Sequence, residues 1–308
     1  MSADTILVTG ATGFLGRAVV EHLAGRGRAV RAAVRRDPGD WPAGVEAIVM
    51  GELSADVDGS AALRGVGTVV HCAARAHVLK ETSADPLAEF RAVNTAATLA
   101  LARQARAAGV RRFVFISSIG VNGSGTHGRP FRHDDVPHPH SPYAVSKYEA
   151  EQGLRALAAE TGLEVVVIRP PLITGRDAKG NLATLNRLIG KGLPLPFGLA
   201  NGNRRDLVSL ETLCDLVDVV LDHPAAPGQT FLVSDGAPVS TRTLLERTAA
   251  AEGRSITLLP VPTALLALPL KLIGKDAMAS QLFGDLEVDI DHTRRTLGWA
   301  PPGQTAAT

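Results

Sequence analysis

Residues 6–16 read ILVTGATGFLG and place three glycines directly after the first short apolar run of the chain. Such a run is typical of a buried parallel strand, and a turn and a helix are expected to follow it. Gly10, Gly13 and Gly16 have the spacing G-x-x-G-x-x-G, which lets a phosphate approach the backbone and lets the helix pack on the strand. The N–H groups that open the helix, with the positive end of its dipole, form an anion site. By itself the motif also fits a tight turn that binds no ligand.

The composition is that of an ordinary globular protein of 308 residues, long enough for one large domain or two modest ones. The 32 basic and 31 acidic residues nearly cancel, so the net charge gives no indication of a nucleic-acid partner. The first strand begins almost at Met1, which leaves no room for a signal peptide and predicts a cytoplasmic protein. Cys72 and Cys214 lie far apart in apolar surroundings and are expected to be reduced thiols.

Strand-like runs alternate with helical segments through the first half of the chain. They are TILVTG, AVRAAVR, VEAIVM, TVVHCAA, RRFVFISS and LEVVVIRPP. Because these runs are continuously apolar, they predict an α/β fold with a doubly wound parallel sheet covered on both faces. We expect a dinucleotide-binding domain at residues 1–173 and a smaller α/β substrate-binding region, mainly residues 174–308, over the C-terminal edge of the sheet. Within this region, residues 206–222 are expected to return to the first domain.

The segment at residues 258–274, LLPVPTALLALPLKLIG, is apolar enough to suggest contact with a membrane. It is shorter than a spanning helix requires, and three prolines interrupt it. We therefore expect a helix packed inside the protein and no membrane association.

The stretch SPYAVSKYEAEQGLRALAAETG, residues 141–162, is a helix with clear start and stop signals. Ser141 suits the N-cap, Pro142 suits the first helical position and a glycine suits the end. Tyr143 and Lys147 lie four residues apart and therefore on one face. A fixed ammonium group favours the phenolate, so it lowers the pKa of a phenol and makes it a usable general acid/base. Taken alone, the two residues also fit a surface pair on an amphipathic helix.

The strand FVFISS ends with Ser117 and Ser118 and is followed by the turn-forming IGVNGSG. Its hydroxyls therefore reach the edge of the sheet where the ligand crevice is expected. A glycine-rich turn, a strand-end serine and a Tyr-x-x-x-Lys pair, in that order, form the full set for reversible hydride transfer at a carbinol. The combination is far more specific than its parts.

With these motifs in place, the sequence resembles the extended short-chain dehydrogenase/reductases, a group of nucleotide-sugar epimerases, dehydratases and 4-keto reductases. The resemblance covers nearly the whole chain and is carried by TGATGFLG, HCAARAHV, VNTAATLALARQA, FVFISSIGVNG, SPYAVSKYEAE, VIRPPLITG, KGNLATLNRLIGKGLPLPFG, NRRDLVSLETLCDLV, FLVSDG and DIDHTRRTLGW. It is strongest to the UDP-glucose 4-epimerase branch and to the 4-keto reductases of surface-polysaccharide assembly. It implies a Rossmann fold, a UDP-sugar substrate and, by analogy with the fold, a homodimer.

The resemblance also implies a role for each matching position. Tyr143 is the expected general acid/base, Lys147 is expected to lower its pKa and hold the nicotinamide ribose, and Ser118 is expected to hydrogen-bond the reacting oxygen. The other implied cofactor positions are Gly10, Gly13, Phe14, Leu15, Glu52, Leu53, Ala73, Ala74, Arg75, Asn94 and Pro170. The implied substrate positions besides Ser118 are Asn181 and Arg205 on the diphosphate, and Leu195 to Phe197 along the uracil.

Two departures from the family pattern refine these expectations. Dehydratases carry an Asp-Glu pair after the strand-end hydroxyl, where this chain has Ile119 and Gly120, so dehydration is not expected. NAD-specific members end the second strand with an acidic residue that accepts from the ribose 2′-OH, where this chain has Val34 followed by Arg35 and Arg36. An arginine there can pair with a 2′-phosphate, which favours NADP(H), whereas NAD binds if both arginines point to solvent. The expected cofactor is therefore NAD or NADP.

The same Ser/Tyr/Lys site serves two reactions. A 4-epimerase oxidises C4 and returns the hydride to the opposite face without net redox change, whereas a 4-keto reductase consumes NAD(P)H at every turnover. Arg35 favours the reductase, and the breadth of the resemblance favours the epimerase, which is slightly ahead.

Three other classes of function fit less well. A non-catalytic dinucleotide sensor usually lacks the Tyr-x-x-x-Lys pair. A reductase of apolar carbonyl compounds leaves Asn181 and Arg205 unpaired, and a serine hydrolase needs a G-x-S-x-G elbow that the chain lacks.

The loop THGRPFRHDDVPHPH has four histidines and two aspartates, but neither the spacing nor the support of a zinc site, so no metal is expected.

Overall fold

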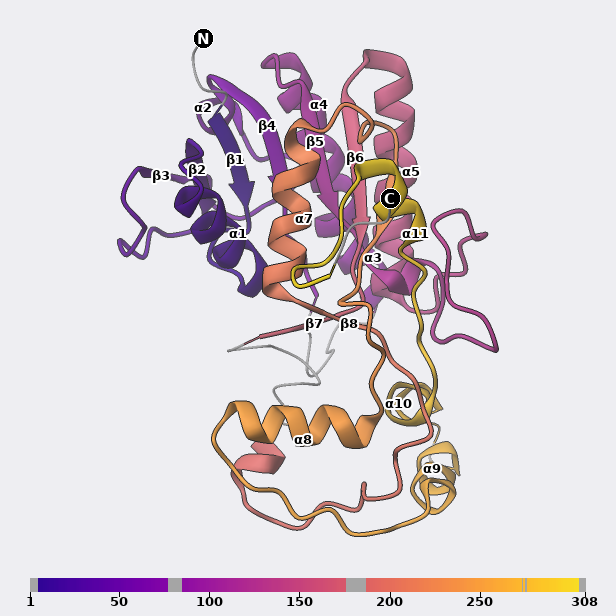
Figure 1. The fold of residues 1–308 in the computed structure, drawn as a ribbon. Helices are drawn as coiled ribbons and strands as arrows, with labels where there is room; N and C mark the ends of the chain where they lie inside the picture. The colour runs from indigo at the N-terminus through magenta and orange to yellow at the C-terminus, as the bar shows by residue number, and fades with distance from the viewer. Residues whose placement is uncertain (1–4, 77–84, 176–186, 273, 275, 305–308) are drawn as a thin grey trace.

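A parallel sheet of seven strands forms the centre of the molecule and carries helices on both faces (Figure 1). The computed structural model describes residues 5–76, 85–175, 187–272, 274 and 276–304. Strand order is β3-β2-β1-β4-β5-β6-β9, and every neighbouring pair is parallel. The strands are β1 (Thr5–Thr9), β2 (Val30–Val34), β3 (Val45–Val49), β4 (Val66–His71), β5 (Arg112–Ile116), β6 (Glu164–Arg169) and β9 (Thr230–Leu232). The prediction of a doubly wound parallel sheet is confirmed.

Successive residues of the central strands enter two separate cores, which explains the continuous apolar runs in the sequence. Val8 and Val70 belong to one core, while their neighbours Leu7 and Val69 belong to the other, and all four are 0% exposed. The first core is closed by α1 (Phe14–Gly25), α7 (Leu210–Asp222) and α11 (Asp291–Leu297), and the second by α2 (Ser60–Leu63), α4 (Ala97–Ala107) and α5 (Pro142–Thr161). Apolar burial on both faces is the main favourable term for such a sheet.

The order in which successive strands are added to the sheet reverses between β1 and β4. From β1 the chain moves outward through β2 to β3, and then crosses back to β4 on the other side of β1. Ligands of open α/β sheets bind in the crevice beyond the carboxyl ends of the strands at such a reversal. The glycine turn after β1 and the residues after β4 therefore lie where a ligand is expected.

The smaller region lies beyond the carboxyl ends of the strands (Figure 1). It contains α8 (Thr241–Ala251), α9 (Thr263–Leu272) and α10 (Asp276–Phe283), and a core of its own that includes Ile189, Leu195, Leu207, Val239 and Leu245. A parallel pair, β7 (Leu172–Thr174) with β8 (Leu207–Ser209), lies between this region and the main sheet. The α7 helix, within residues 206–222, packs on α1 beside the main sheet.

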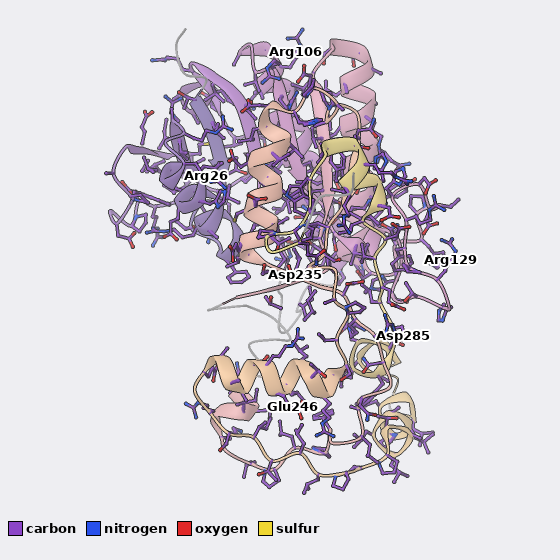
Figure 2. All side chains as sticks on the ribbon, in the orientation of Figure 1. Arg26, Arg106, Arg129, Asp235, Glu246 and Asp285 are labelled. Atoms are coloured by element: carbon purple, nitrogen blue, oxygen red, sulfur yellow. The ribbon has the colours of Figure 1, made fainter. Side chains whose placement is uncertain are left out.

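One carboxylate helps to join β8 to the end of the main sheet. Asp235 follows β9 and is labelled in Figure 2. Its oxygens accept hydrogen bonds from the Ser209 backbone N–H at 3.0 Å and from the Ser209 hydroxyl at 3.2 Å. Because Ser209 is also the N-cap of α7, this contact fixes the start of that helix.

The helix predicted within residues 258–274 is present as α9, but the prediction that it packs inside the protein is wrong. Leu265, Leu268 and Leu272, which share one helical face, are 63%, 56% and 77% exposed. The core of the smaller region is filled by α8 and the segments around Leu195 and Val239, which leaves α9 at the periphery. Among the described residues, no helix is long and apolar enough to cross a membrane.

Candidate functional site

The glycine turn between β1 and α1 brings three backbone segments into close contact. Gly10 has φ +66°, and a Cβ on it would lie 2.8 Å from the backbone of Ala73 after β4. The Gly13 N–H donates to the Gly10 carbonyl at 2.8 Å, and a Cβ on Gly16 would lie 2.2 Å from the same oxygen. Gly13 is the N-cap of α1, and no side chain caps this helix. The opening N–H groups of α1 are therefore available to an anion, and a glycine at each of these positions has a physical reason.

The next two positions, Phe14 and Leu15, open α1 and pack in opposite directions. Phe14 contacts the core of the smaller region, and Leu15 contacts the main-sheet core beside α7. The N-terminus of α1 therefore contacts both the main-sheet core and the core of the smaller region.

Asn94 ties the segment after β4 to α5. Its side chain is 0% exposed, accepts from the Arg75 N–H at 2.9 Å and donates to the Arg75 carbonyl at 3.1 Å. It also donates to Ser146 Oγ at 3.0 Å, and Ser146 in turn donates to the Tyr143 carbonyl at 2.8 Å. Ala73 and Ala74 lie between this anchor and the glycine turn. The structure therefore brings these expected cofactor positions together, and Ser146 is a link that sequence reasoning missed.

Asn94 lies in a π-helical segment, η1 (Arg91–Ala96), that follows α3 (Pro86–Phe90) and continues into α4. A π-helical turn shifts the register of a helix and is often found at functional sites. Nothing in the residue types RAVNTA distinguishes it from an ordinary helix, so the sequence does not predict this turn.

The remaining expected cofactor positions differ in their exposure to solvent. Arg35 follows β2 directly and is exposed, as is Arg36. Glu52 is exposed, and Leu53 packs against the core on the α4 side. Pro170 is buried at the end of β6, and its carbonyl accepts from the Ile119 N–H at 3.0 Å.

The candidate catalytic residues come from the end of β5 and the first two turns of α5. Ser118 caps η2 (Ile119–Val121), and its Oγ accepts from the Gly120 N–H at 3.1 Å. The predicted helix signals of α5 are confirmed, since Ser141 Oγ accepts from the Ala144 N–H at 3.2 Å and the helix closes at a left-handed glycine. Tyr143 is half-buried, with its ring edge against Phe90 at 6.0 Å between centroids.

Burial dominates the protonation of this helix face. The Lys147 side chain is 2% exposed, and its Nζ lies 4.3 Å from the centre of the Phe115 ring. Burial lowers the pKa of Lys147 to about 7, while the nearby Cys72 and Glu151 raise it. Burial also raises the pKa of Tyr143 to about 12, opposite to the direction expected from Lys147 alone. Desolvation of the phenol therefore outweighs the neighbouring ammonium.

The described substrate positions other than Ser118 lie in the smaller region, and Asn181 is outside the described residues. Leu195 is buried and pairs through its backbone with the strand-like segment at Leu258. The centroids of the Phe197 and Phe283 rings lie 6.2 Å apart. Arg205 donates to the carbonyl of Gly284 at 3.0 Å and packs at the C-terminal end of α10.

An open cavity of about 500 Å³ lies beside these residues. Its walls come from the loop after η2, the segment before β8 and the ends of α9 and α10, and include Thr126, Asn203, Phe283 and Asp285. Asp285, labelled in Figure 2, also accepts from the Arg204 N–H at 2.7 Å. Sequence reasoning missed this cavity, because its wall residues are distant in the chain.

The histidine-rich loop before α5 contacts the C-terminal segment. The rings of His133 and His292 stack at 3.6 Å between centroids, and Phe131 donates its backbone N–H to the Glu287 carbonyl at 2.8 Å. Among the described residues, no group of three or more His, Cys, Asp or Glu side chains is placed to hold a metal ion. Cys72 and Cys214 are both free thiols.

A buried histidine near the candidate site predicts that the stability of the protein is sensitive to acid. His71, 0% exposed at the end of β4, shares hydrogen bonds with Thr9 at 2.8 Å and Thr98 at 3.0 Å. Burial, and secondarily Lys147, lowers the pKa of His71 to about 3. The pKa of His71 is lower in the folded protein than in the unfolded chain. Its contribution to the free energy of unfolding is therefore fully present above about pH 6.5 and is lost as the pH falls towards 3. At about pH 5 the loss from this group is about 2 kcal/mol.

We expect His71→Gln to remove this part of the acid sensitivity. Urea unfolding at about pH 7.5 and pH 5 measures it as the difference in unfolding free energy between the two conditions. The exposed His127 provides the matched control, His127→Gln, which is expected to leave the wild-type pH dependence unchanged. An equal loss of stability in His71→Gln and wild type would show that His71 is not the titrating group.

Known proteins match this chain in family profile, in sequence and in structure. The profile of the NAD dependent epimerase/dehydratase family matches residues 6–234. The chain is 46% identical over 304 residues to a UDP-glucose 4-epimerase of Vibrio cholerae, covering 97% of this chain and 91% of that protein. The solved structure of MoeE5 in complex with UDP-glucose and NAD is similar with a TM-score of 0.73 at 26% identity, covering 99% of this chain and 94% of that one. A UDP-N-acetylglucosamine 4-epimerase of Bacillus cereus has a TM-score of 0.77 at 21% identity, covering 97% and 94% of the two chains, and supports the fold alone.

Proposed function

Because the chain belongs to the NAD dependent epimerase/dehydratase family, we propose that it catalyses the 4-epimerisation of a UDP-hexose, UDP-glucose or UDP-N-acetylglucosamine. The observation that carries this proposal is the 46% identity to a UDP-glucose 4-epimerase over almost the whole chain. The arrangement of Ser118, Tyr143 and Lys147 at one edge of the sheet supports the same chemistry.

The described residues fit a dinucleotide. The glycine turn leaves no room for a Cβ at Gly10 or Gly16, and the N-terminus of α1 faces the crevice without a side-chain cap. A pyrophosphate on these N–H groups is the simplest account of that arrangement. NAD held by the glycine turn and the N-terminus of α1 would supply the acceptor and donor of the C4 hydride. Asn94 keeps the opposite wall of the crevice in place through its bonds to Arg75 and Ser146.

The side chains of α5 and β5 move and hold the proton at the C4 oxygen. Tyr143 takes the proton of the C4 hydroxyl as the phenolate when the sugar is oxidised, and returns it to the same oxygen when the keto sugar is reduced. Lys147, on the same helix face, stabilises the phenolate that remains and holds the nicotinamide ribose. Ser118 hydrogen-bonds the same sugar oxygen. The buried Ile119 and Gly120 that follow it offer no acid or base for a dehydration.

The smaller region is proposed to hold the nucleotide. Arg205 and Asn181 bind the diphosphate, and the segment from Leu195 to Phe197 lies along the uracil. Burial lowers the pKa of Arg205, which a bound diphosphate would oppose through its negative charge. The polar cavity beside Arg205 supports a polar ligand over an apolar one.

The 4-keto reductase is the second candidate, and the exposed Arg35 at the end of β2 favours it. A guanidinium at this position pairs with the 2′-phosphate of NADP(H). We expect Arg35→Asp to weaken NADP(H) binding by about 10- to 100-fold and to leave NAD(H) binding within about threefold, because only NADP carries the phosphate.

Titration of cofactor fluorescence with NADH and NADPH measures both affinities. Arg36→Asp is the matched control, since it makes the same change in charge at the adjacent exposed position. If Arg35→Asp retains the wild-type affinity for NADPH, Arg35 has no role in selecting the cofactor.

Incubation of the purified protein with each UDP-sugar and NAD+ or NADP+ tests the proposed function, with chromatography to separate the C4 epimers. Formation of the galacto epimer without net cofactor reduction is the expected result. No epimer, together with oxidation of NADPH when a UDP-4-keto-6-deoxy sugar is added, would establish the reductase in its place.

The cellular compartment and the oligomeric state of the enzyme are part of the same proposal. The free thiols of Cys72 and Cys214 support a reducing compartment, and we propose the cytoplasm. A homodimer is proposed by analogy with the fold, and light scattering distinguishes it from a monomer.

A further inference from the structure

A fully buried carboxylate lies one helical turn beyond Lys147. Glu151 is 0% exposed and follows Tyr143 and Lys147 at intervals of four residues, so the three side chains share one face of α5. Burying a charge is costly unless it is paired and hydrogen-bonded. The partners of Glu151 therefore show what this position does.

Glu151 joins α5 to the ends of two strands. Arg169, at the end of β6 and 2% exposed, donates to both carboxylate oxygens at 2.9 and 2.6 Å. Ser117, directly after β5, donates its hydroxyl at 2.6 Å. Arg155, one turn later on α5, donates to the second oxygen at 3.2 Å. The bidentate contact is the strong form of a charge-assisted pair and fixes distance and orientation together.

Two of these partners, Ser117 and Arg169, adjoin positions of the proposed site. Ser117 immediately precedes Ser118, and Arg169 immediately precedes Pro170. The third nitrogen of Arg169 donates to Asn122 Oδ1 at 2.9 Å, and Asn122 closes the short helix that Ser118 caps.

We propose that Glu151 is a positioning residue. By joining α5 to the ends of β5 and β6, it fixes Ser118 and Lys147 relative to each other, a role that rests on the proposed function. A buried ion pair is by itself weak evidence of stabilisation, because packed apolar side chains are often as stable. Apolar side chains in place of this ion pair could not make the directional hydrogen bonds that join α5 to the ends of β5 and β6.

The same carboxylate also acts on Lys147 through space. Among the described residues, the titratable groups that face Lys147 are His71 and Cys72 at the end of β4, and Tyr143 and Glu151 on its own helix. His71 and Cys72 are neutral at pH 7, because burial lowers the pKa of the histidine and raises that of the thiol. Cys72 and Glu151 both raise the pKa of Lys147 against the effect of burial, and Glu151, paired with Arg169, is the carboxylate of the two.

Glu151→Gln tests the proposal, because it keeps the shape of the side chain and removes the charge. We expect kcat at about pH 7 to fall by about 10- to 100-fold, with KM for the UDP-sugar and the affinity for NAD within about threefold. Glu160→Gln, the same substitution at an exposed position of α5, is the matched control and is expected to keep wild-type kcat.

A readout that does not depend on activity separates this proposal from the proposed function. The chain has only six lysines, so ¹³C labelling at their Cε atoms gives few NMR signals, and Lys147→Met identifies the one from Lys147. We expect the titration midpoint of Lys147 to fall by about one pH unit in Glu151→Gln, with no shift in Glu160→Gln. This shift is measurable even if the wild type acts on none of the UDP-sugars.

Two further variants keep the test decisive. Glu151→Asp retains the charge and is expected to restore the Lys147 midpoint, with kcat between those of wild type and Glu151→Gln. If Glu151→Gln fails to fold, Ser117→Ala removes one of the contacts, and we expect it to lower kcat by about three- to tenfold without a shift of the Lys147 midpoint. A Glu151→Gln variant that is less stable but keeps wild-type kcat, KM and Lys147 midpoint would overturn the proposal, as would wild-type kcat in Ser117→Ala.

Discussion

Tyr143→Phe is expected to lower kcat by about a thousandfold and to leave the affinity for NAD within about threefold. The substitution removes only the phenol oxygen that is proposed to exchange a proton with the C4 oxygen, and the ring keeps its edge contact with Phe90. Steady-state assay of the epimer, with NAD binding measured by calorimetry, gives both quantities.

The chain offers a matched control for this change. Its one other tyrosine, Tyr148, is half-buried on the same helix, and Tyr148→Phe is expected to keep wild-type kcat. Wild-type turnover in Tyr143→Phe would rule out the phenol as the acid/base of the reaction.

Gly16→Ala is expected to have the second large effect, on both cofactor binding and stability. The new Cβ would lie 2.2 Å from the Gly10 carbonyl oxygen and 2.7 Å from its carbon, so backbone rather than a flexible side chain must move. We expect a loss of about 3 kcal/mol in unfolding free energy and at least about a hundredfold weaker NAD binding, because the glycine turn opens.

Gly25→Ala, at the other end of α1, provides the comparison. A Cβ there meets nothing within 4 Å, and replacement of a helical glycine by alanine is expected to stabilise the protein by about 0.5–1 kcal/mol. Urea unfolding and NAD titration of the two variants measure the contrast. Wild-type NAD affinity in Gly16→Ala would contradict the account of the glycine turn.

The sheet and the α5 helix could be predicted because their signals are local. Each strand of a sheet buried on both faces reads as a short apolar run, and the run FVFI corresponds to β5. The start of α5 is set by Ser141 and Pro142, whose capping and backbone preferences act within one turn. Short-range chemistry therefore accounts for most of the architecture.

Features that depend on distant residues were missed. The exposure of α9 depends on which segments fill the core of the smaller region, and its apolar sequence alone suggests burial. The π-helical turn at Asn94 is linked to a serine 52 residues away. The pKa of Tyr143 was expected to be lowered by a lysine one turn away, but burial by other elements raises it.

The candidate site could be assembled from the sequence in outline only. The glycine turn, Ser118, Tyr143 and Lys147 are recognisable by type and order, and the fold brings their strand and helix ends to one edge. The connections among them, through Asn94 and Ser146 on one side and Glu151 and Arg169 on the other, are contacts between segments far apart in the chain. Spacing along the sequence carries no signal of such contacts.

Mass spectrometry of UDP-glucose that carries deuterium at C4 tests the proposed epimerisation most directly. Because the hydride removed from C4 returns to C4 of the same sugar, the UDP-galactose formed is expected to retain the deuterium, with no label in the free cofactor pool. Absence of the epimer, or transfer of deuterium to free NADH or NADPH in step with the sugar consumed, would contradict the account.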